Sequence, residues 1–127
     1  MVDDTGELKL IDFGFAIKIE DPRKNVFNFC GTTVYMSPEI FQRKAYDPFK
    51  ADVWALGVLL YKVVTGVYPF EYNDNASFMK LLSEGQVNYR LIKDWKLKRL
   101  LEEMLEVNEL NRINIDGVLR HEWLRRN

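Results

Sequence analysis

A short acidic motif near the start of the chain has residue types that could bind a metal ion. Asp12, Phe13 and Gly14 directly follow the apolar run of residues 8–11, so the Asp12 carboxylate lies at the end of a predicted strand, beside a flexible glycine. An aspartate in this position can bind a hard cation such as Mg²⁺, whose remaining ligands come from phosphates and water. Taken alone, however, the three residues are better explained as a turn closed by Asp and Gly.

Four further motifs follow, and their order changes that interpretation. They are residues 30–35, the group Met36-Ser37-Pro38-Glu39, the segment Asp52-Val53-Trp54-Ala55-Leu56-Gly57 and the pair Asn111-Arg112. Together with Asp12-Phe13-Gly14, this ordered set resembles the C-terminal lobe of a eukaryotic-type protein kinase. The resemblance covers essentially the whole chain. Several motifs at the expected spacings make it far more specific than any one of them alone.

The resemblance implies a set of functional residues. Asp12 would be the metal-binding aspartate of the Asp-Phe-Gly motif, and Phe13 the residue whose packing distinguishes active from inactive states. Residues 15–35 would form the activation segment. ATP and Mg²⁺ would be the cofactors, and a protein would be the substrate. The substrate-facing loop would consist of Gly31, Thr32, Thr33, Val34 and Tyr35.

The substrate-facing loop resembles the version found in serine/threonine kinases rather than the Pro-rich version of tyrosine kinases. Thr32 would contact the catalytic aspartate and lysine of the complete enzyme. Residues 29–32 and 51–66 are most similar to the calmodulin-dependent and AMP-activated kinase group. Lys62 stands where some basic-directed kinases carry a glutamate that binds substrate arginine, which argues against an arginine-directed preference through that contact.

A second set of residues would have structural roles. Ser37-Pro38-Glu39 matches the family's Ala-Pro-Glu motif, with Ser in place of Ala. By analogy with the family, Glu39 would form a buried ion pair with Arg112 that anchors the end of the activation segment. The alternative is two unrelated surface charges. Asp52 would accept hydrogen bonds from the catalytic-loop backbone, although an aspartate favoured by a helix dipole is also compatible with its position.

The elements that position these motifs are mostly helices. Residues 8–11 predict a brief strand, and the charged residues 18–28 predict an exposed loop. Ser37 and Pro38 predict a helix start. Apolar residues at helical spacing predict further helices over residues 51–65, 76–84, 92–105 and 115–124. The fold class is therefore mainly α, a helical C-terminal lobe of the kinase fold that lacks the N-terminal lobe and the catalytic loop.

Composition limits the possible functions. The chain has 127 residues, of which 47% are hydrophobic, and this fits one folded domain rather than a disordered segment. A net charge of −1 provides no basic field for nucleic acid or anionic lipid. The longest apolar stretch, residues 53–65, is too short to span a bilayer. With a single cysteine, Cys30, and no signal peptide, these features predict an intracellular, cytoplasmic protein that binds neither nucleic acid nor membrane.

The catalytic machinery that the family carries before its Asp-Phe-Gly motif does not occur in residues 1–127. The Gly-rich loop, the phosphate-binding lysine and the His-Arg-Asp loop are missing. We therefore expect a partial kinase domain, with the Asp-Phe-Gly strand and activation segment in residues 1–39 and a helical subdomain in residues 40–127. The complete chain would transfer phosphate from ATP to protein serine or threonine, whereas this fragment alone would be inactive.

Two alternatives stay open: a truncated pseudokinase lobe that acts as a protein-binding module, and a degenerate gene product. Without the helices that precede the catalytic loop, the apolar helix 51–65 would have one uncovered face. A protein partner could cover this exposed helical core, with helix 76–84 as a further docking element. Asp52 would also lack its partner loop, so the fragment would be marginally stable.

Regulation by phosphorylation is a separate expectation. Residues 15–31 contain no serine, threonine or tyrosine, and Asn28 stands near the usual position of the activating phosphorylated residue. Thr32 is nearby, but the resemblance gives it a substrate-contact role. The sequence therefore predicts no conventional activation-loop phosphorylation.

Overall fold

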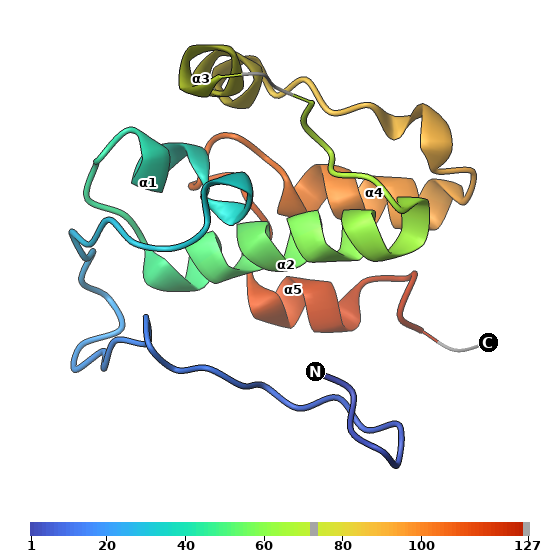
Figure 1. Cartoon of the computed structure of the whole chain (residues 1–127), viewed down its shortest axis with the longest axis horizontal. Coiled ribbons are helices and arrows are strands. Elements are labelled where there is room, and N and C mark those ends of the chain that lie inside the picture. Colours follow the sequence, from blue (N-terminus) through green and yellow to red (C-terminus); the bar gives the residue numbers. More distant parts are fainter. Residues whose placement is uncertain (72–73, 126–127) are drawn as a thin grey trace.

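The computed structural model describes residues 1–71 and 74–125, and most of its regular structure is helical. In chain order, the helices are the 3-10 helix η1 (Thr33–Tyr35), α1 (Pro38–Phe41), α2 (Pro48–Thr65), α3 (Asn75–Glu84), the 3-10 helix η2 (Tyr89–Leu91), α4 (Trp95–Met104) and α5 (Ile115–Arg120). Helix α2 lies in the middle and contacts η1, α4 and α5, whereas α1 packs against α3 (Figure 1). The N-terminal segment, drawn in blue, runs extended beside this helical body.

The mainly α fold class is confirmed, but the predicted strand over residues 8–11 is wrong. Val2 and Leu8 form an isolated antiparallel bridge, and the Lys9 N–H donates to the Met1 carbonyl at 2.8 Å. Within the described residues, the backbone of residues 10 and 11 has no hydrogen-bonding partner. A strand needs a neighbour along its length. Because this segment has one only at its start, the apolar run stays extended but unpaired.

The central helix α2 begins at Pro48 rather than at residue 51. The Asp47 carboxylate explains the earlier start, because it accepts hydrogen bonds from two backbone N–H groups of the first turn, at 2.9 and 3.3 Å. Pro48 fits the first helical position, where no N–H is needed. The helix ends where predicted, at Gly66, whose φ of +80° is the left-handed conformation of a glycine C-cap.

Helices α3 and α1 both begin at residues that the sequence suggested as N-caps, but only α3 has side-chain capping hydrogen bonds. The prediction of helix 76–84 is confirmed, with a start one residue earlier. Asp74 and Ser77 form a reciprocal capping box, and Gly85 ends the helix at a φ of +61°. Ser37 occupies the N-cap position of α1, as predicted, but its side chain makes no capping hydrogen bond.

Helices α4 and α5 are shorter than predicted. The apolar spacing suggested a helix over residues 92–105, but residues 92–94 are extended and the Asp94 carboxylate caps a helix that begins at Trp95. The last helix ends at Arg120 rather than at residue 124. His121 is extended there, with a ψ of 142°, and its Nδ1 accepts the Trp123 N–H at 3.2 Å.

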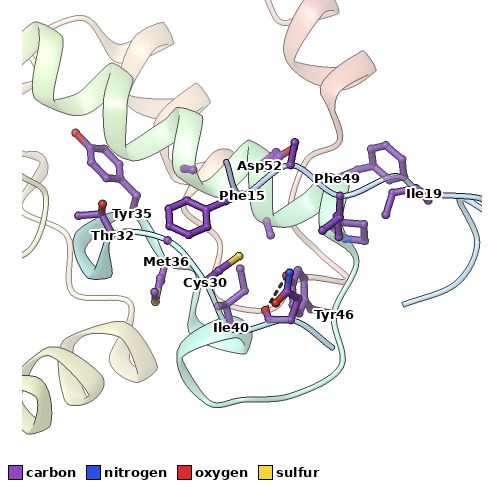
Figure 2. A pocket seen from close by; sticks show the side chains of 17 residues that line it. Phe15, Ile19, Cys30, Thr32, Tyr35, Met36, Ile40, Tyr46, Phe49 and Asp52 are labelled. Carbon is purple, nitrogen blue, oxygen red and sulfur yellow. Dashed lines mark hydrogen bonds between the residues drawn. The ribbon is translucent and has the colours of Figure 1, made fainter. Parts of the chain in front are cut away.

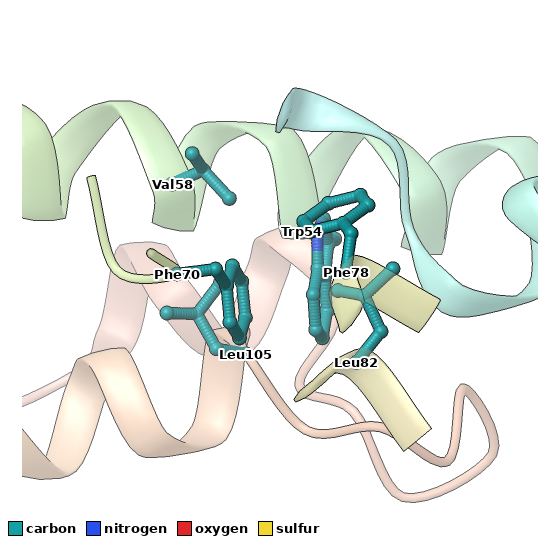
Figure 3. Close-up of a cluster of buried hydrophobic side chains, with 6 residues drawn as sticks. All are labelled: Trp54, Val58, Phe70, Phe78, Leu82 and Leu105. Atoms are coloured by element: carbon teal, nitrogen blue, oxygen red, sulfur yellow. The ribbon is translucent and has the colours of Figure 1, made fainter. Parts of the chain in front are cut away.

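The largest cluster of buried apolar side chains joins α2 to α3 and to the end of α4. It consists of Trp54, Val58, Phe70, Phe78, Leu82 and Leu105 (Figure 3). The rings of Trp54 and Phe70 stack at 5.8 Å, and Phe78 meets Phe70 edge-on at 6.0 Å. Gly57 allows α2 to approach α4 closely, because a Cβ at this position would lie 3.0 Å from the Cβ of Met104.

One face of α2 is uncovered. Leu56, Leu59 and Val63 follow one another at helical spacing and are all exposed, Val63 by 71%. This agrees with the expectation from the sequence that part of this apolar helix lacks neighbours. Among the described residues, no helix has both the length and the apolar character that crossing a membrane requires.

Candidate functional site

A buried ion pair joins two residues that lie 73 positions apart. Glu39, at the start of α1, receives hydrogen bonds from both terminal nitrogens of Arg112, at 2.7 and 3.0 Å. Both side chains are buried, and that of Arg112 is fully so. The parallel two-bond geometry is the strongest that a guanidinium and a carboxylate can form.

Arg112 is held by more than its partner carboxylate. Its Nε donates to the Glu106 carbonyl at 2.9 Å, and its terminal nitrogens also donate to the carbonyls of Lys50 and Val107, at 3.0 and 3.4 Å. The guanidinium carbon lies 5.0 Å from the ring centroid of Trp54. The buried charge is therefore fully hydrogen-bonded, which is the condition under which a buried cation is tolerated.

The electrostatics of the pair favour the ionised form. Burial acts to raise the pKa of Glu39, but the hydrogen bonds and the charge of Arg112 outweigh it, so the pKa lies below its ordinary value of 4.5. The pair connects the segment that ends at Glu39 to the C-terminal part of the chain. It fixes the end of the predicted activation segment against the helical body.

A cavity of about 370 Å³ lies between the segment before η1 and the first turns of α2. Side chains from residues 15–19, 28–36 and 46–55 line it, mainly with apolar surface (Figure 2). Tyr46 is one of the lining residues, and its hydroxyl donates to the Asn28 carbonyl at 3.0 Å. Val26 and Tyr46 also form an isolated backbone bridge, which ties the predicted loop 18–28 to the segment before α2.

The predicted substrate-facing loop is divided between this cavity and the core. Gly31, Thr32 and Tyr35 line the cavity, whereas Val34 is buried and Thr33 starts η1. Gly31 has a φ of +114°, a conformation that a side chain would strain. The glycine therefore sets the path by which the chain enters the loop.

Lys62 lies next to this loop through an aromatic pair. Its ammonium is 4.5 Å from the ring centroid of Tyr68 and donates to the Gly66 carbonyl at 2.7 Å. The Tyr68 ring meets that of Tyr35 edge-on at 5.9 Å. A cation, rather than a carboxylate, therefore stands beside the predicted substrate-facing loop.

Asp52 lies on the cavity wall near the start of α2 (Figure 2). Its carboxylate has no hydrogen-bonding partner among the described residues. The residue is exposed to solvent, but the atoms packed around its carboxyl group partly desolvate it and raise its pKa.

The Asp-Phe-Gly motif lies apart from the cavity. Asp12 has a φ of +61°, rare for a residue with a side chain, and its Oδ1 accepts the Gly14 N–H at 3.1 Å. Phe13 is 70% exposed. The structure thus brings Thr32 and Asp52 to one cavity but leaves the Asp12 carboxylate exposed on the N-terminal segment.

Several residues at the site were missed by the sequence analysis. Phe15 points into the cavity, and Cys30 and Tyr46 line its wall (Figure 2). Lys50 donates through its ammonium to the Arg112 carbonyl. No local motif marks Phe15, Tyr46 or Lys50, and the motif of residues 30–35, which includes Cys30, does not reveal that the Cys30 side chain lines a cavity. The apolar character of Phe15 does not show in which direction its side chain points.

Comparisons with known proteins identify the class to which this fold and site belong. Residues 1–124 match the family described as the protein kinase domain, so the chain belongs to the protein kinase family.

Within the protein kinase family, individual relatives of this chain are named as serine/threonine kinases. A Saccharomyces cerevisiae protein, YPL150W, whose name assigns it provisionally to the serine/threonine kinases, is 37% identical over 126 residues, which are 98% of this chain and 14% of that protein. The CBL-interacting serine/threonine-protein kinases 18 and 13 of Arabidopsis thaliana are 36% and 32% identical, over 99% of this chain and 25% and 26% of those proteins. The chain is thus related to serine/threonine kinases of this kind and spans about a quarter or less of the length of these three relatives.

The family generally uses ATP and Mg²⁺. Asp12 carries the one carboxylate of the Asp-Phe-Gly motif that could serve as a metal ligand. Its exposed carboxylate leaves Oδ2 without a partner in the described part of the chain. Mg²⁺ is commonly bound by one or two carboxylates together with phosphates and water. Residues 1–71 and 74–125 contain no group of three or more His, Cys, Asp or Glu side chains that could hold a metal by themselves. Asp12 would therefore need phosphate oxygens to complete the coordination.

Proposed function

We propose that this chain is the C-terminal part of a serine/threonine protein kinase domain. In the complete domain, Asp12 would hold Mg²⁺ on the phosphates of ATP, and residues 31–35 would shape the site for the protein substrate. The observation that carries the proposal is the buried pair of Glu39 and Arg112, because it joins two motifs 73 residues apart with full hydrogen bonding. Two unrelated surface charges would not be buried and bidentate.

The proposed division of the chain follows from the same pair. Residues 1–39 would form the Asp-Phe-Gly segment and the activation segment, which includes Phe13 and Gly14 and ends at Ser37-Pro38-Glu39. Residues 40–127 would form the helical subdomain. Thr32 and Asp52 line the same cavity, in keeping with a loop that meets catalytic residues supplied by another part of the kinase. Similarity to the CBL-interacting kinases favours serine or threonine as the acceptor.

The proposal is tested on the longest chain that the transcript encodes around this sequence. Asp12→Asn should lower phosphate transfer from ATP to a protein substrate by about a hundredfold or more, because a metal ligand is lost. Asp4→Asn is the matched control, since Asp4 is also an exposed aspartate of the N-terminal segment. Equal activity of both variants and the unaltered chain would contradict the role of Asp12. We expect residues 1–127 alone to transfer no phosphate.

A protein-binding module is the second candidate function. The exposed face of α2 favours it, because Leu56, Leu59 and Val63 form an apolar stripe at the centre of the fold. A pseudokinase lobe would use such a stripe to bind a partner. If the transcript encodes no His-Arg-Asp loop before Met1 and the protein still accumulates, this candidate replaces the kinase. A cytoplasmic location belongs to both proposals, and cell fractionation tests it.

A further inference from the structure

The start of α4 carries a basic and aromatic surface that the proposed kinase site does not use. Residues 90–99 contain five basic side chains and one acidic side chain, in a protein whose net charge is −1. We define the basic–aromatic patch as Arg90, Leu91, Lys93, Trp95 and Lys96.

The apolar members of the patch are exposed to solvent. Trp95 is 61% exposed, whereas Trp54 is fully buried in the core. Leu91 is 52% exposed. The ammonium of Lys96 lies 5.8 Å from the Trp95 ring centroid, so a cation already borders the free aromatic face. Exposed aromatic side chains beside cations are typical of binding surfaces.

In residues 1–71 and 74–125, no carboxylate forms an ion pair with the basic members of the patch. Farther along the helix, Lys98 pairs with Glu102 at 3.6 Å, and Arg99 pairs with Glu103 at 3.2 Å. Within the described residues, no ion pair involves the other three cations of the segment, Arg90, Lys93 and Lys96.

The acidic residue of the segment is occupied in capping. Asp94 accepts the backbone N–H groups of Lys96 and Leu97, at 2.9 and 3.3 Å. Its negative charge stabilises the positive end of the helix rather than a neighbouring cation. The patch therefore keeps its positive character.

The order of charges along α4 is opposite to the one that stabilises a helix. Its cations cluster near the N-terminus and its glutamates in the last turn, although the helix dipole favours the reverse. Helix α5 follows the favoured order, with Asp116 in the first turn and Arg120 in the last. The i,i+4 ion pairs of Lys98 and Arg99 account for those two cations, but helix stability does not explain Lys96 in the first turn. Violations of such a rule concentrate at functional sites.

The patch stands on a rigid base. Ile92 and Leu97 are buried in a cluster with Tyr61 and Leu101, beneath the exposed residues. The Tyr61 hydroxyl donates to the Asn88 carbonyl at 2.6 Å, just before the patch. A pre-organised surface of this kind loses little conformational entropy when it binds.

We propose that the basic–aromatic patch binds a short acidic segment of a partner protein. Carboxylates of that segment pair with the unpaired cations, and one of its apolar side chains packs on Trp95. A bilayer or a nucleic acid would extend beyond the patch and meet the glutamates that follow on the same helix, Glu102 and Glu103. A short peptide avoids this repulsion, so charge complementarity favours it.

The test uses the full 127-residue chain and a fluorescein-labelled peptide of alternating glutamate and leucine. Binding is followed by fluorescence anisotropy. The double reversal Lys93→Glu with Lys96→Glu should weaken binding by about tenfold or more. Lys18→Glu with Lys24→Glu is the matched control, because it changes the net charge equally at exposed lysines outside the patch. The control should bind like the unaltered chain.

A second pair of variants separates the apolar contact from charge. Trp95→Ala should weaken binding several-fold, whereas Phe27→Ala, which removes another exposed aromatic ring, should not. Circular dichroism establishes that each variant is folded as the unaltered chain is. No peptide binding by the unaltered chain, or equal loss in the patch and control variants, would overturn the proposal. Binding to phosphatidylserine vesicles but not to the peptide would also overturn it, in favour of a membrane.

Discussion

The helical body and the N-terminal segment of this protein are built in contrasting ways. From η1 onward, the helices enclose three clusters of buried side chains, and the charge of Arg112 is fully hydrogen-bonded inside them. Before η1, most large apolar side chains are exposed, and Leu10 is 89% exposed. The two regions contain similar apolar residues, but only one of them has neighbours to bury these residues.

The contrast shows where this chain determines its own conformation. In the body, burial and capping fix each element, and the pair of Glu39 and Arg112 fixes where the body begins. In the N-terminal segment, the described residues supply local turns but bury few apolar side chains, although Asp12 holds a rare backbone conformation there. The proposed metal ligand thus lies in the region that the chain stabilises least, and the proposed anchor lies in the region that it stabilises most.

The largest effect should come from removing one partner of the buried ion pair. Arg112→Met leaves the Glu39 carboxylate buried without a counter-charge, and this should cost about 3–5 kcal/mol of unfolding free energy. The double variant Glu39→Gln with Arg112→Met should be less destabilised than Arg112→Met alone, because the stranded charge is gone. Urea denaturation followed by circular dichroism measures both. A double variant that is the less stable of the two would show that the stranded charge is not the cause.

A matched pair of phenylalanines sharpens the contrast between the regions. Phe78 is fully buried in the largest cluster, and its change to alanine should cost about 3–5 kcal/mol. Phe13, in the N-terminal segment, is exposed, and Phe13→Ala should change stability by less than about 0.5 kcal/mol. Thermal unfolding of the two variants provides the comparison. A large loss in Phe13→Ala would mean that this side chain is packed in solution.

Acid should weaken the helical body through Glu39. Its pKa is lower in the folded chain than the ordinary value of 4.5, so the ionised form stabilises the fold above that value. This contribution is lost as the pH falls below 4.5 and through the lower pKa of the folded state. The slope of unfolding free energy against pH in that range should be smaller in Glu39→Gln. Equal slopes in the two proteins would exclude Glu39 as the titrating group.

Asp52 should give the smallest effect, and one of opposite sign. Burial raises its pKa, so the ionised carboxylate destabilises the folded chain at neutral pH, and this cost vanishes below the ordinary value of 3.8. Asp52→Asn should therefore stabilise the chain at neutral pH, by less than about 1 kcal/mol because solvent screens the group. Differential scanning calorimetry at neutral and acidic pH measures the difference. Destabilisation at neutral pH would mean that a hydrogen-bond donor reaches the carboxylate.

Sequence reasoning succeeded where a local rule decides the structure. Gly66 and Gly85 end their helices as predicted, because each adopts a left-handed conformation that glycine permits. Sequence reasoning failed where a capping residue sets the helix boundary. Apolar spacing predicted that α4 begins at Ile92, but Asp94 caps the helix, which begins at Trp95. The strand over residues 8–11 was wrong because pairing requires a partner, which periodicity does not reveal.

The candidate site was predictable only in part, for the same reason. Glu39 and Arg112 were identified through family motifs, since nothing in their local sequence relates two residues so far apart. The cavity was not foreseen, because Phe15, Cys30 and Tyr46 come together only through the path of the loop. Motifs indicated which residues matter, whereas tertiary packing decided which of them meet.

Hydrogen exchange measured by mass spectrometry on the full chain tests most directly the claim that the two regions differ. Peptides covering α2 should be strongly protected, because their amides are hydrogen-bonded inside the helical body. Peptides covering residues 8–20 should exchange at the earliest time measured, since the described residues provide few partners for their amides. Protection of residues 8–20 similar to that of α2 would contradict the account. It would mean that the amides of the Asp-Phe-Gly segment are stably hydrogen-bonded within this chain.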